Sequence, residues 1–207
     1  MNIGLFSDIV EQGGMPQSEF CGTWGLLTPN SLPKASFNAF SFLSRLRGSR
    51  LEVRHDTLPP GCGLVATSEG DRVRVLLWFR DLSIYGAGVP QHWAGALELP
   101  WTGAAKPLLI EDRIAAHAGS CYETWQSLGC PQNLSPAERN LLKAHSAPET
   151  RLYEPEAQGG RLTHEFRLMP GEVLLCELGP QGAAALPKRP LREEAAAWYA
   201  AHREKSK

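Results

Sequence analysis

Several features are scarce or missing in this 207-residue sequence, and each absence excludes a class of partner or site. Basic residues are not in surplus, because 21 Lys and Arg stand against 22 Asp and Glu for a net charge of −1. A phosphate backbone requires a basic surface, so nucleic acid is not an expected partner. No apolar run reaches the roughly 18 residues that cross a membrane. No basic segment leads into an apolar run at the start either. We therefore expect no membrane partner, no export signal in this chain and, as written, a cytoplasmic location.

Metal-ligating residues are present but dispersed. The five cysteines include no C-x-x-C pair, and no two of the six histidines lie four residues apart on a predicted helix. Zinc sites usually show such clustering. We therefore predict no metal ion and no cofactor, and interpret the cysteines as small buried thiols. A disulfide between Cys121 and Cys130 remains an alternative. The sequence also has neither a G-x-S-x-G segment nor a glycine-rich phosphate loop.

Glycine and proline are frequent, with 20 and 16 copies, which favours many turns and short strands. The length is suited to one or two domains. After Gly48 the apolar pattern acquires a period of two, which is typical of half-buried strands. The expected strands are residues 51–55, 63–67, 72–79, 93–99, 106–113, 161–168 and 172–178. Strands of this kind separated by turns predict a β-sandwich of the immunoglobulin or fibronectin kind.

Three helices are expected beside these strands. The first spans residues 33–47, with Ser31 as its cap, Pro33 in its first turn and Gly48 after its end. Its predicted apolar face consists of Phe37, Phe40, Leu43 and Leu46. The second, residues 135–145, begins with a capping box and interrupts the sheet region. The third, residues 191–207, is acidic at its start and basic at its end.

Six segments, in order along the chain, resemble parts of family 39 glycoside hydrolases, the β-xylosidase and α-L-iduronidase group. The first three resemble the last strand, the loop and the last helix of their (β/α)₈ barrel. The other three resemble a strand, a loop–helix insertion and the closing hairpin of their accessory sandwich. The segments are 6–11 (FSDIVE), 20–27 (FCGTWGLL), 33–40 (PKASFNAF), 71–78 (DRVRVLLW), 120–133 with the capped helix, and 160–163 with 170–178.

This resemblance implies a division of the chain. Residues 1–48 would be the remnant of the last βα unit of the barrel, residues 49–190 the accessory β-sandwich, and residues 191–207 a C-terminal helix. Retaining glycosidases use two carboxyl groups about 5–5.5 Å apart. In this family both come from earlier barrel strands, so no catalytic residue is assigned here. We expect the chain to have no catalytic activity on its own, although it would derive from an enzyme that acts on xylosides or uronic-acid-containing glycans.

The resemblance also names three candidate substrate contacts. Asp8 and Glu11 follow a strand on the face where barrel active sites lie, and Trp24 would stack on a sugar ring. The alternatives are solvated loop acids and a packed core aromatic. The sequence departs from the family pattern at two places near these candidate sugar contacts: Gly4-Leu5 replace a Trp-Thr pair, and Cys21 replaces a histidine.

A second hypothesis is a free-standing module that binds carbohydrate or pairs with a separately encoded barrel chain. Trp93, Trp101 and Trp125 would line a glycan-binding face, or else fill the space between the sheets. Residues 1–47 carry large apolar side chains that need a covering surface. The expected partners are therefore a glycan, or a barrel-carrying chain or second copy bound through residues 1–47. Folding back onto the sandwich is the remaining alternative.

Overall fold

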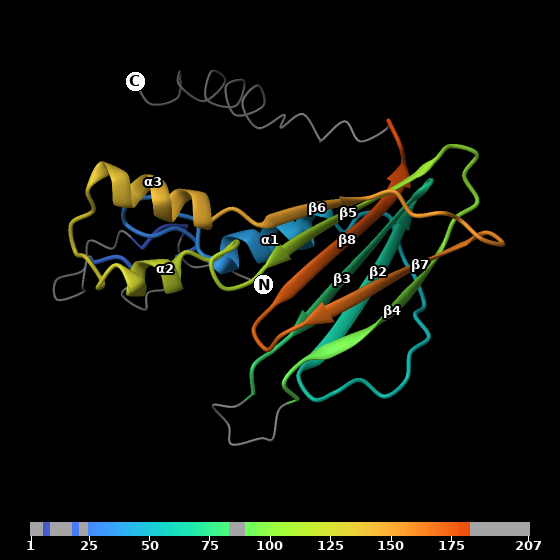
Figure 1. The fold of residues 1–207 in the computed structure, drawn as a ribbon, viewed down its shortest axis with the longest axis horizontal. Helices are drawn as coiled ribbons and strands as arrows, with labels where there is room; N and C mark the ends of the chain where they lie inside the picture. The colour runs from blue at the N-terminus through green and yellow to red at the C-terminus, as the bar shows by residue number, and fades with distance from the viewer. Residues whose placement is uncertain (1–5, 9–17, 21–24, 83–89, 183–207) are drawn as a thin grey trace, which may run out of the picture.

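The computed structural model describes residues 6–8, 18–20, 25–82 and 90–182, and these residues are mainly β (Figure 1). Six strands form one sheet in the order β1-β2-β3-β8-β5-β6, and β4 pairs with β7 in a second sheet. Among the described strands β1 to β8, every pairing is antiparallel. The expectation of a mainly β chain with few helices is thereby confirmed. None of the described helices has the length and apolar character of a transmembrane span.

The elements follow one another in the order that Figure 1 labels. They are α1 (Ala35–Arg45), β1 (Ser49–Arg50), β2 (Cys62–Glu69), β3 (Arg72–Phe79), β4 (Trp93–Pro100), β5 (Pro107–Ile114), α2 (Tyr122–Ser127), α3 (Pro136–His145), β6 (Glu149–Tyr153), β7 (Arg161–Leu168) and β8 (Val173–Pro180).

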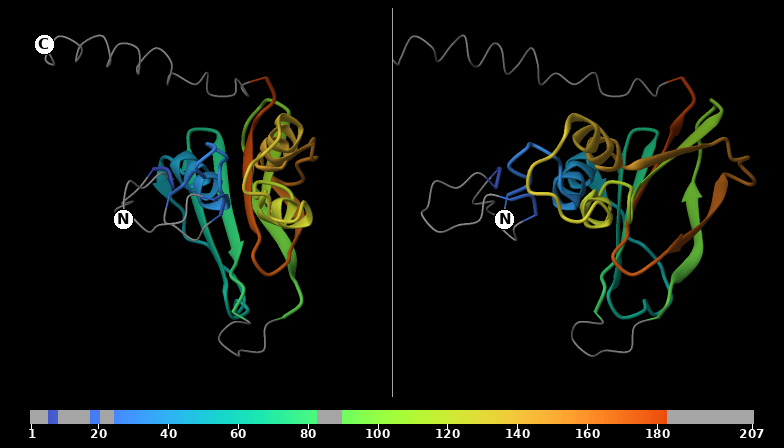
Figure 2. Two further views of the ribbon diagram at one scale, coloured as in Figure 1. Left: turned by 90° about the vertical axis from the view of Figure 1, so that its left-hand side faces the viewer. Right: turned by 60° about the vertical axis from the view of Figure 1, so that its left-hand side comes forward.

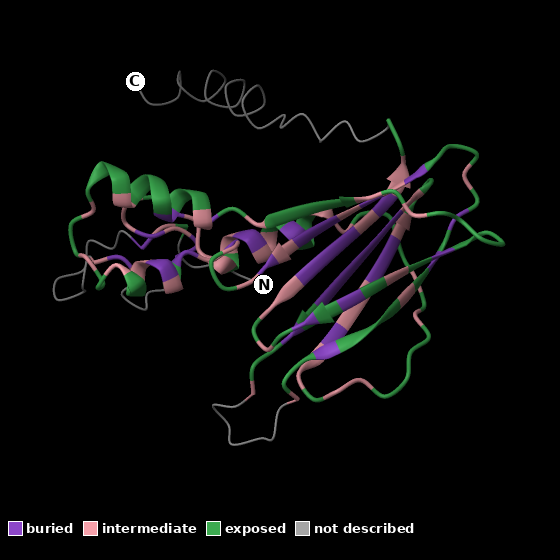
Figure 3. Cartoon of the chain, in the orientation of Figure 1, coloured by how far each residue is buried: buried purple, intermediate pink, exposed green. Residues whose placement is uncertain are grey.

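The main core lies between the two sheets, which face each other in the turned view of Figure 2. Strand β3 shows how the sequence builds it: Val73, Val75, Leu77 and Phe79 alternate along the strand and all belong to this core. Successive strand residues point to opposite faces of a sheet. The neighbouring strands β3, β8 and β5 accordingly hold most of the buried strand residues in the described part of the chain (Figure 3).

Helix α1 covers the opposite, outer face of the six-stranded sheet. Phe42 of the helix packs with Leu76, Ile114 and Leu175, one residue from each of β3, β5 and β8. At the end of the helix, Arg45 forms ion pairs with Asp112 and Glu177 on that same face. The residues of β3, β5 and β8 whose side chains point away from the main core thus form the surface on which α1 docks.

A small helical lobe continues from the N-terminal end of α1. Leu32, Cys121 and Leu142 form its buried centre, bringing together the segment before α1 with α2 and α3. The predicted capping box of α3 is present: Ser135 accepts from the Glu138 N–H, and the Glu138 carboxylate accepts from the Ser135 N–H. Asn38 of α1 donates to the carbonyls of Gly119 and Ser146, which fixes the lobe to the helix.

Several expectations about the strands were wrong. Of the first predicted strand, 51–55, only the Leu51 N–H bonds to β2, and the paired residues are Ser49 and Arg50 instead. Strand β6 was missed because it is an edge strand with almost no buried side chain, so it lacks an alternating pattern. Strands β7 and β8 do not form a hairpin. Their connection passes from one sheet to the other.

The helices also differ in detail from the prediction. Helix α1 begins at Ala35 after an N-cap at Lys34, while Ser31 lies upstream with a φ of 61° and does not cap it. The helix buries Asn38 and Phe42, whereas Leu43 is 47% exposed. Helix α2, within the segment that resembles a loop–helix insertion, was not predicted as a separate helix. Cys121 and Cys130 are free thiols, so the alternative of a disulfide is excluded. The predicted helix 191–207 lies outside the described residues.

Candidate functional site

Of the three predicted substrate contacts, only Asp8 falls in the described part of the chain. Its carboxylate accepts a hydrogen bond of 2.9 Å from the Gly25 N–H and forms an ion pair with Lys34. The side chain is fully buried, so it is not the solvated loop acid of the alternative interpretation. Its structural role is to tie its own segment to the one that leads into α1. Glu11 and Trp24 lie outside the described residues, and sugar contact at all three stays a prediction.

The backbone around Asp8 explains why its neighbour is a glycine. Ser7 and Leu27 form a parallel bridge, and the Asp8 N–H donates to the Leu27 carbonyl. A Cβ on Gly25 would lie 2.5 Å from the Asp8 nitrogen, closer than any real contact. Glycine is therefore required where the two segments cross.

A second buried acid, Glu19, lies in the same N-terminal region and was not a sequence candidate. It accepts from the backbone N–H of Asn30 at 3.2 Å and from the side-chain amide of that residue. Its other carboxylate oxygen is buried and has no hydrogen-bond partner among the residues that the structure describes. Glu19 thus holds the loop before α1, as Asp8 does.

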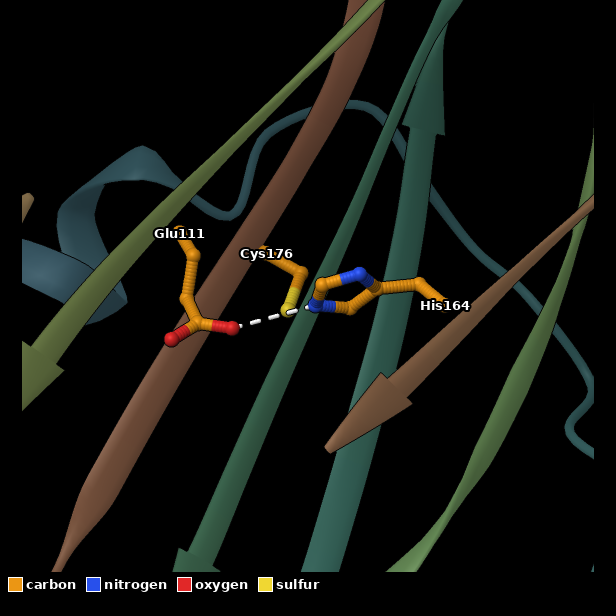
Figure 4. Close-up of side chains that lie close together, drawn as sticks. All are labelled: Glu111, His164 and Cys176. Carbon is orange, nitrogen blue, oxygen red and sulfur yellow. Dashed lines mark hydrogen bonds and ion pairs between the residues drawn. The ribbon is translucent and has the colours of Figure 1, made fainter. Parts of the chain in front are cut away.

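The described residues that bring ligand-type side chains together are Glu111, His164 and Cys176 (Figure 4). They lie in the core between the sheets, on β5, β7 and β8. Glu111 and Cys176 are direct cross-strand partners, and His164 reaches them from the facing sheet. The His164 Nε2 atom is 3.0 Å from Glu111 Oε2. Their oxygen, nitrogen and sulfur atoms all lie within 4.8 Å of one another.

Charged neighbours hold the Glu111 carboxylate in its ionised form. Burial alone would raise the pKa of Glu111, but the His164 hydrogen bond and the Arg113 guanidinium outweigh it and lower the pKa below its usual value. Arg113 lies 3.2 Å from Glu111 and 2.8 Å from Glu172, so it links two acids. The cluster therefore combines a carboxylate and a guanidinium inside an otherwise apolar core.

The thiol of Cys176 is not set up as a nucleophile. Burial raises its pKa well above that of a free cysteine, and the nearby Glu111 charge acts in the same direction. A nucleophilic cysteine needs a lowered pKa and access to substrate, whereas this side chain is 1% exposed. The arrangement of Cys, His and acid is thus not that of a cysteine hydrolase. Its available chemistry is hydrogen bonding and the coordination of a cation.

Sequence reasoning missed this cluster because its members lie 53 and 12 residues apart along the chain. One signal was present: His164 occupies an inward position of β7 between the apolar Leu162 and Phe166. Alternation therefore places His164 in the core. The pairing of Glu111 with Cys176 depends on the register between β5 and β8, which no local pattern specifies.

Comparison with known proteins shows the family to which this chain belongs. The sequence profile of the Glycosyl hydrolases family 39 matches residues 2–163. The chain belongs to this family. The resemblance inferred from six short segments is confirmed.

Curated relatives and a solved structure agree with the family. The β-xylosidase of Caldicellulosiruptor saccharolyticus is 23% identical over 170 residues, which cover 82% of this chain and 34% of that protein. The β-xylosidase of Geobacillus stearothermophilus is 23% identical over 175 residues, covering 84% and 32%. The crystal structure of the family 39 enzyme from Xanthomonas axonopodis pv. citri superposes with a TM-score of 0.68 at 20% identity, over 84% of this chain and 36% of that one. This family 39 chain thus spans about a third of the length of these relatives.

Proposed function

We propose that this chain is the C-terminal accessory portion of a family 39-like glycoside hydrolase. Residues 49–190 would form the accessory β-sandwich, residues 1–48 the last strand and helix of a (β/α)₈ barrel, and residues 191–207 a terminal helix. The observation that carries the proposal is the pattern of coverage. The likeness extends over 84% of this chain but only 36% of the Xanthomonas enzyme. The described part of this chain contains two facing sheets, and helix α1 is docked on the six-stranded one.

The proposed role of the portion is to brace the barrel. A barrel of this class closes only with eight strands and eight helices. Within the described residues, the Ser7–Leu27 parallel bridge and α1 would form one such unit in this proposal. Helix α1 is fastened to the six-stranded sheet through Phe42 and Arg45. A barrel that includes α1 would therefore be joined rigidly to the sandwich.

The proposal includes catalytic silence of the 207-residue polypeptide. The parent activity would be directed at xylosides or uronic-acid-containing glycans, and its paired carboxyl groups would lie on barrel strands that this sequence does not supply. The purified polypeptide is incubated with aryl xylosides and aryl iduronides, beside a family 39 xylosidase as positive control. No turnover is expected. Clear turnover that Glu11→Gln abolishes would refute the proposal.

A second candidate function is a module that binds glycan or pairs with a separate barrel chain. The exposed apolar side chains on the N-terminal region favour it, since Phe6 is 65% and Leu43 47% exposed. Calorimetric titration with xylo-oligosaccharides and uronic-acid polymers tests glycan binding. Light scattering of the chain, beside a variant that begins at Ser49, tests association through residues 1–47. A mass above that of one chain for the full polypeptide, together with the mass of a single chain for the shorter variant, supports association through residues 1–47.

A further inference from the structure

We propose that Glu111, His164 and Cys176 form a zinc-binding site that joins the two sheets. A carboxylate, an imidazole and a thiol are typical zinc ligands. Here each comes from a different strand, with the ligand atoms within 4.8 Å of one another. The site has no part in the proposed accessory function and stands independently of it.

The strands hold the three side chains in place. Glu111 and Cys176 are paired in the antiparallel ladder of β5 and β8, so their Cβ atoms lie about 4.5–5.5 Å apart on the same face. His164 extends from β7 across the core, with its ring directed at the Glu111 carboxylate and beside the Cys176 sulfur (Figure 4). Two ligands thus belong to one sheet and the third to the other.

The separations are close to those of a tetrahedral centre. Zinc bonds of about 2.3 Å to sulfur and 2.0–2.2 Å to nitrogen and oxygen imply ligand atoms roughly 3.3–3.7 Å from one another. His164 and Glu111 are 3.0 Å apart, and the widest separation in the group is at most 4.8 Å. A movement of about 1 Å, within the reach of side-chain rotation, would bring all three atoms onto one ion.

The charges around the cluster suit a divalent cation. A Cys176 thiolate and the Glu111 carboxylate together neutralise Zn²⁺, and the Arg113 charge is balanced by Glu172. Coordination forms a zinc–sulfur bond and releases the thiol proton to solvent. Arg113, on the far oxygen of Glu111, would orient this ligand from outside the coordination sphere. The thiolate selects a softer metal than Mg²⁺ or Ca²⁺.

The alternative is a buried hydrogen-bonded pair, in which His164 and Glu111 join the sheets and Cys176 is a small core residue. The two differ in sulfur coordination, so the test uses cobalt as a spectroscopic substitute for zinc. The 207-residue chain is refolded under reducing conditions with Co²⁺ or Zn²⁺, desalted, and analysed for bound metal. One ion per chain and a sulfur-to-cobalt charge-transfer band are expected. Zinc at a hundredfold excess over Kd should raise Tm by about 5–10 °C.

Matched cysteine variants decide the outcome. Cys130→Ser removes an exposed thiol and should leave the band and the Tm increase unchanged. Cys176→Ala keeps the His164–Glu111 pair but should abolish both, as should His164→Gln. If Cys176→Ala does not fold, His164→Gln takes its place, and persistence of the band in that variant overturns the proposal. Absence of the band from refolded wild type, or its persistence in Cys176→Ala, overturns the proposal in favour of the hydrogen-bonded pair.

Discussion

The two faces of the six-stranded sheet are held by different kinds of interaction. The inner face, toward β4 and β7, is a continuous apolar core apart from the cluster around Glu111. The outer face has a smaller apolar contact under α1, supplemented by the ion pairs of Arg45 with Asp112 and Glu177. Beside the sheet, Asn38 of the same helix donates to the Gly119 and Ser146 carbonyls of the helical lobe, 81 and 108 positions away in the chain. The comparison indicates that the inner face maintains the fold, whereas the outer face fixes where α1 lies.

The largest expected effect comes from the inner face. Phe79 is 1% exposed at the end of β3, and Phe79→Ala should lower the free energy of unfolding by about 3–5 kcal/mol. Chemical denaturation monitored by circular dichroism measures it. Leu152→Ala, at a position 66% exposed on β6, is the matched control and should stay within about 0.5 kcal/mol of the parent. An equal loss of unfolding free energy in the two variants would contradict the conclusion that the inner core maintains the fold.

This difference between the faces also explains what the sequence could predict. Val73, Val75, Leu77 and Phe79 alternate over a single strand, so β3 and its buried face were readable from local pattern. The polar contacts of α1 are not local: Arg45 meets Asp112 and Glu177 only after the sheet has formed. The predicted apolar face of the helix accordingly included Leu43, which is exposed, and omitted Phe42, which is buried. The partner of each polar group is set by strand order and register, which a single sequence does not encode locally.

The same reasoning applies to the candidate sites. Glu111, His164 and Cys176 looked unrelated because the order β3-β8-β5 and the sheet switch after β7 bring them together. Asp8, in contrast, was selected from the family resemblance, and its burial against Gly25 and Lys34 was not anticipated. The resemblance thus selected Asp8 without giving its contacts, and its contact with a sugar stays a prediction.

The next largest effect is expected at Asn38, which is 6% exposed and donates to two backbone carbonyls. Asn38→Ala leaves the Gly119 and Ser146 carbonyls without this donor, at a cost of about 2 kcal/mol. Amide hydrogen exchange should accelerate in α1 and in the 119–146 lobe while β3 stays protected. Faster exchange in β3 as well would show that the outer face is not separable from the core.

A smaller effect is expected at Arg45. Burial alone would lower the pKa of this guanidinium, but Glu177 and Asp112 outweigh it and raise the pKa, so the charge is retained. Its side chain is 29% exposed and Glu177 also pairs with Arg74, so solvent and a second partner moderate the loss. Arg45→Met should cost about 1 kcal/mol. A double-mutant cycle with Asp112→Asn measures the coupling, and additive losses would show that the pair contributes nothing.

The smallest effect concerns the capping box of α3, far from both faces of the sheet. Hydrogen bonds from the Ser135 side chain and backbone lower the pKa of Glu138. A carboxyl group with a lowered folded-state pKa stabilises the protein above its unfolded pKa, about 4.3. This stability is lost as the pH falls through the lower folded value. Glu138→Gln should therefore be slightly less stable than the parent at neutral pH, and the difference should vanish in acid. Thermal unfolding of both proteins from neutral pH to pH about 3 measures this, with Glu156→Gln, at an exposed acid, as control. A difference that persists unchanged in acid would assign the effect to packing of the side chain and not to its charge.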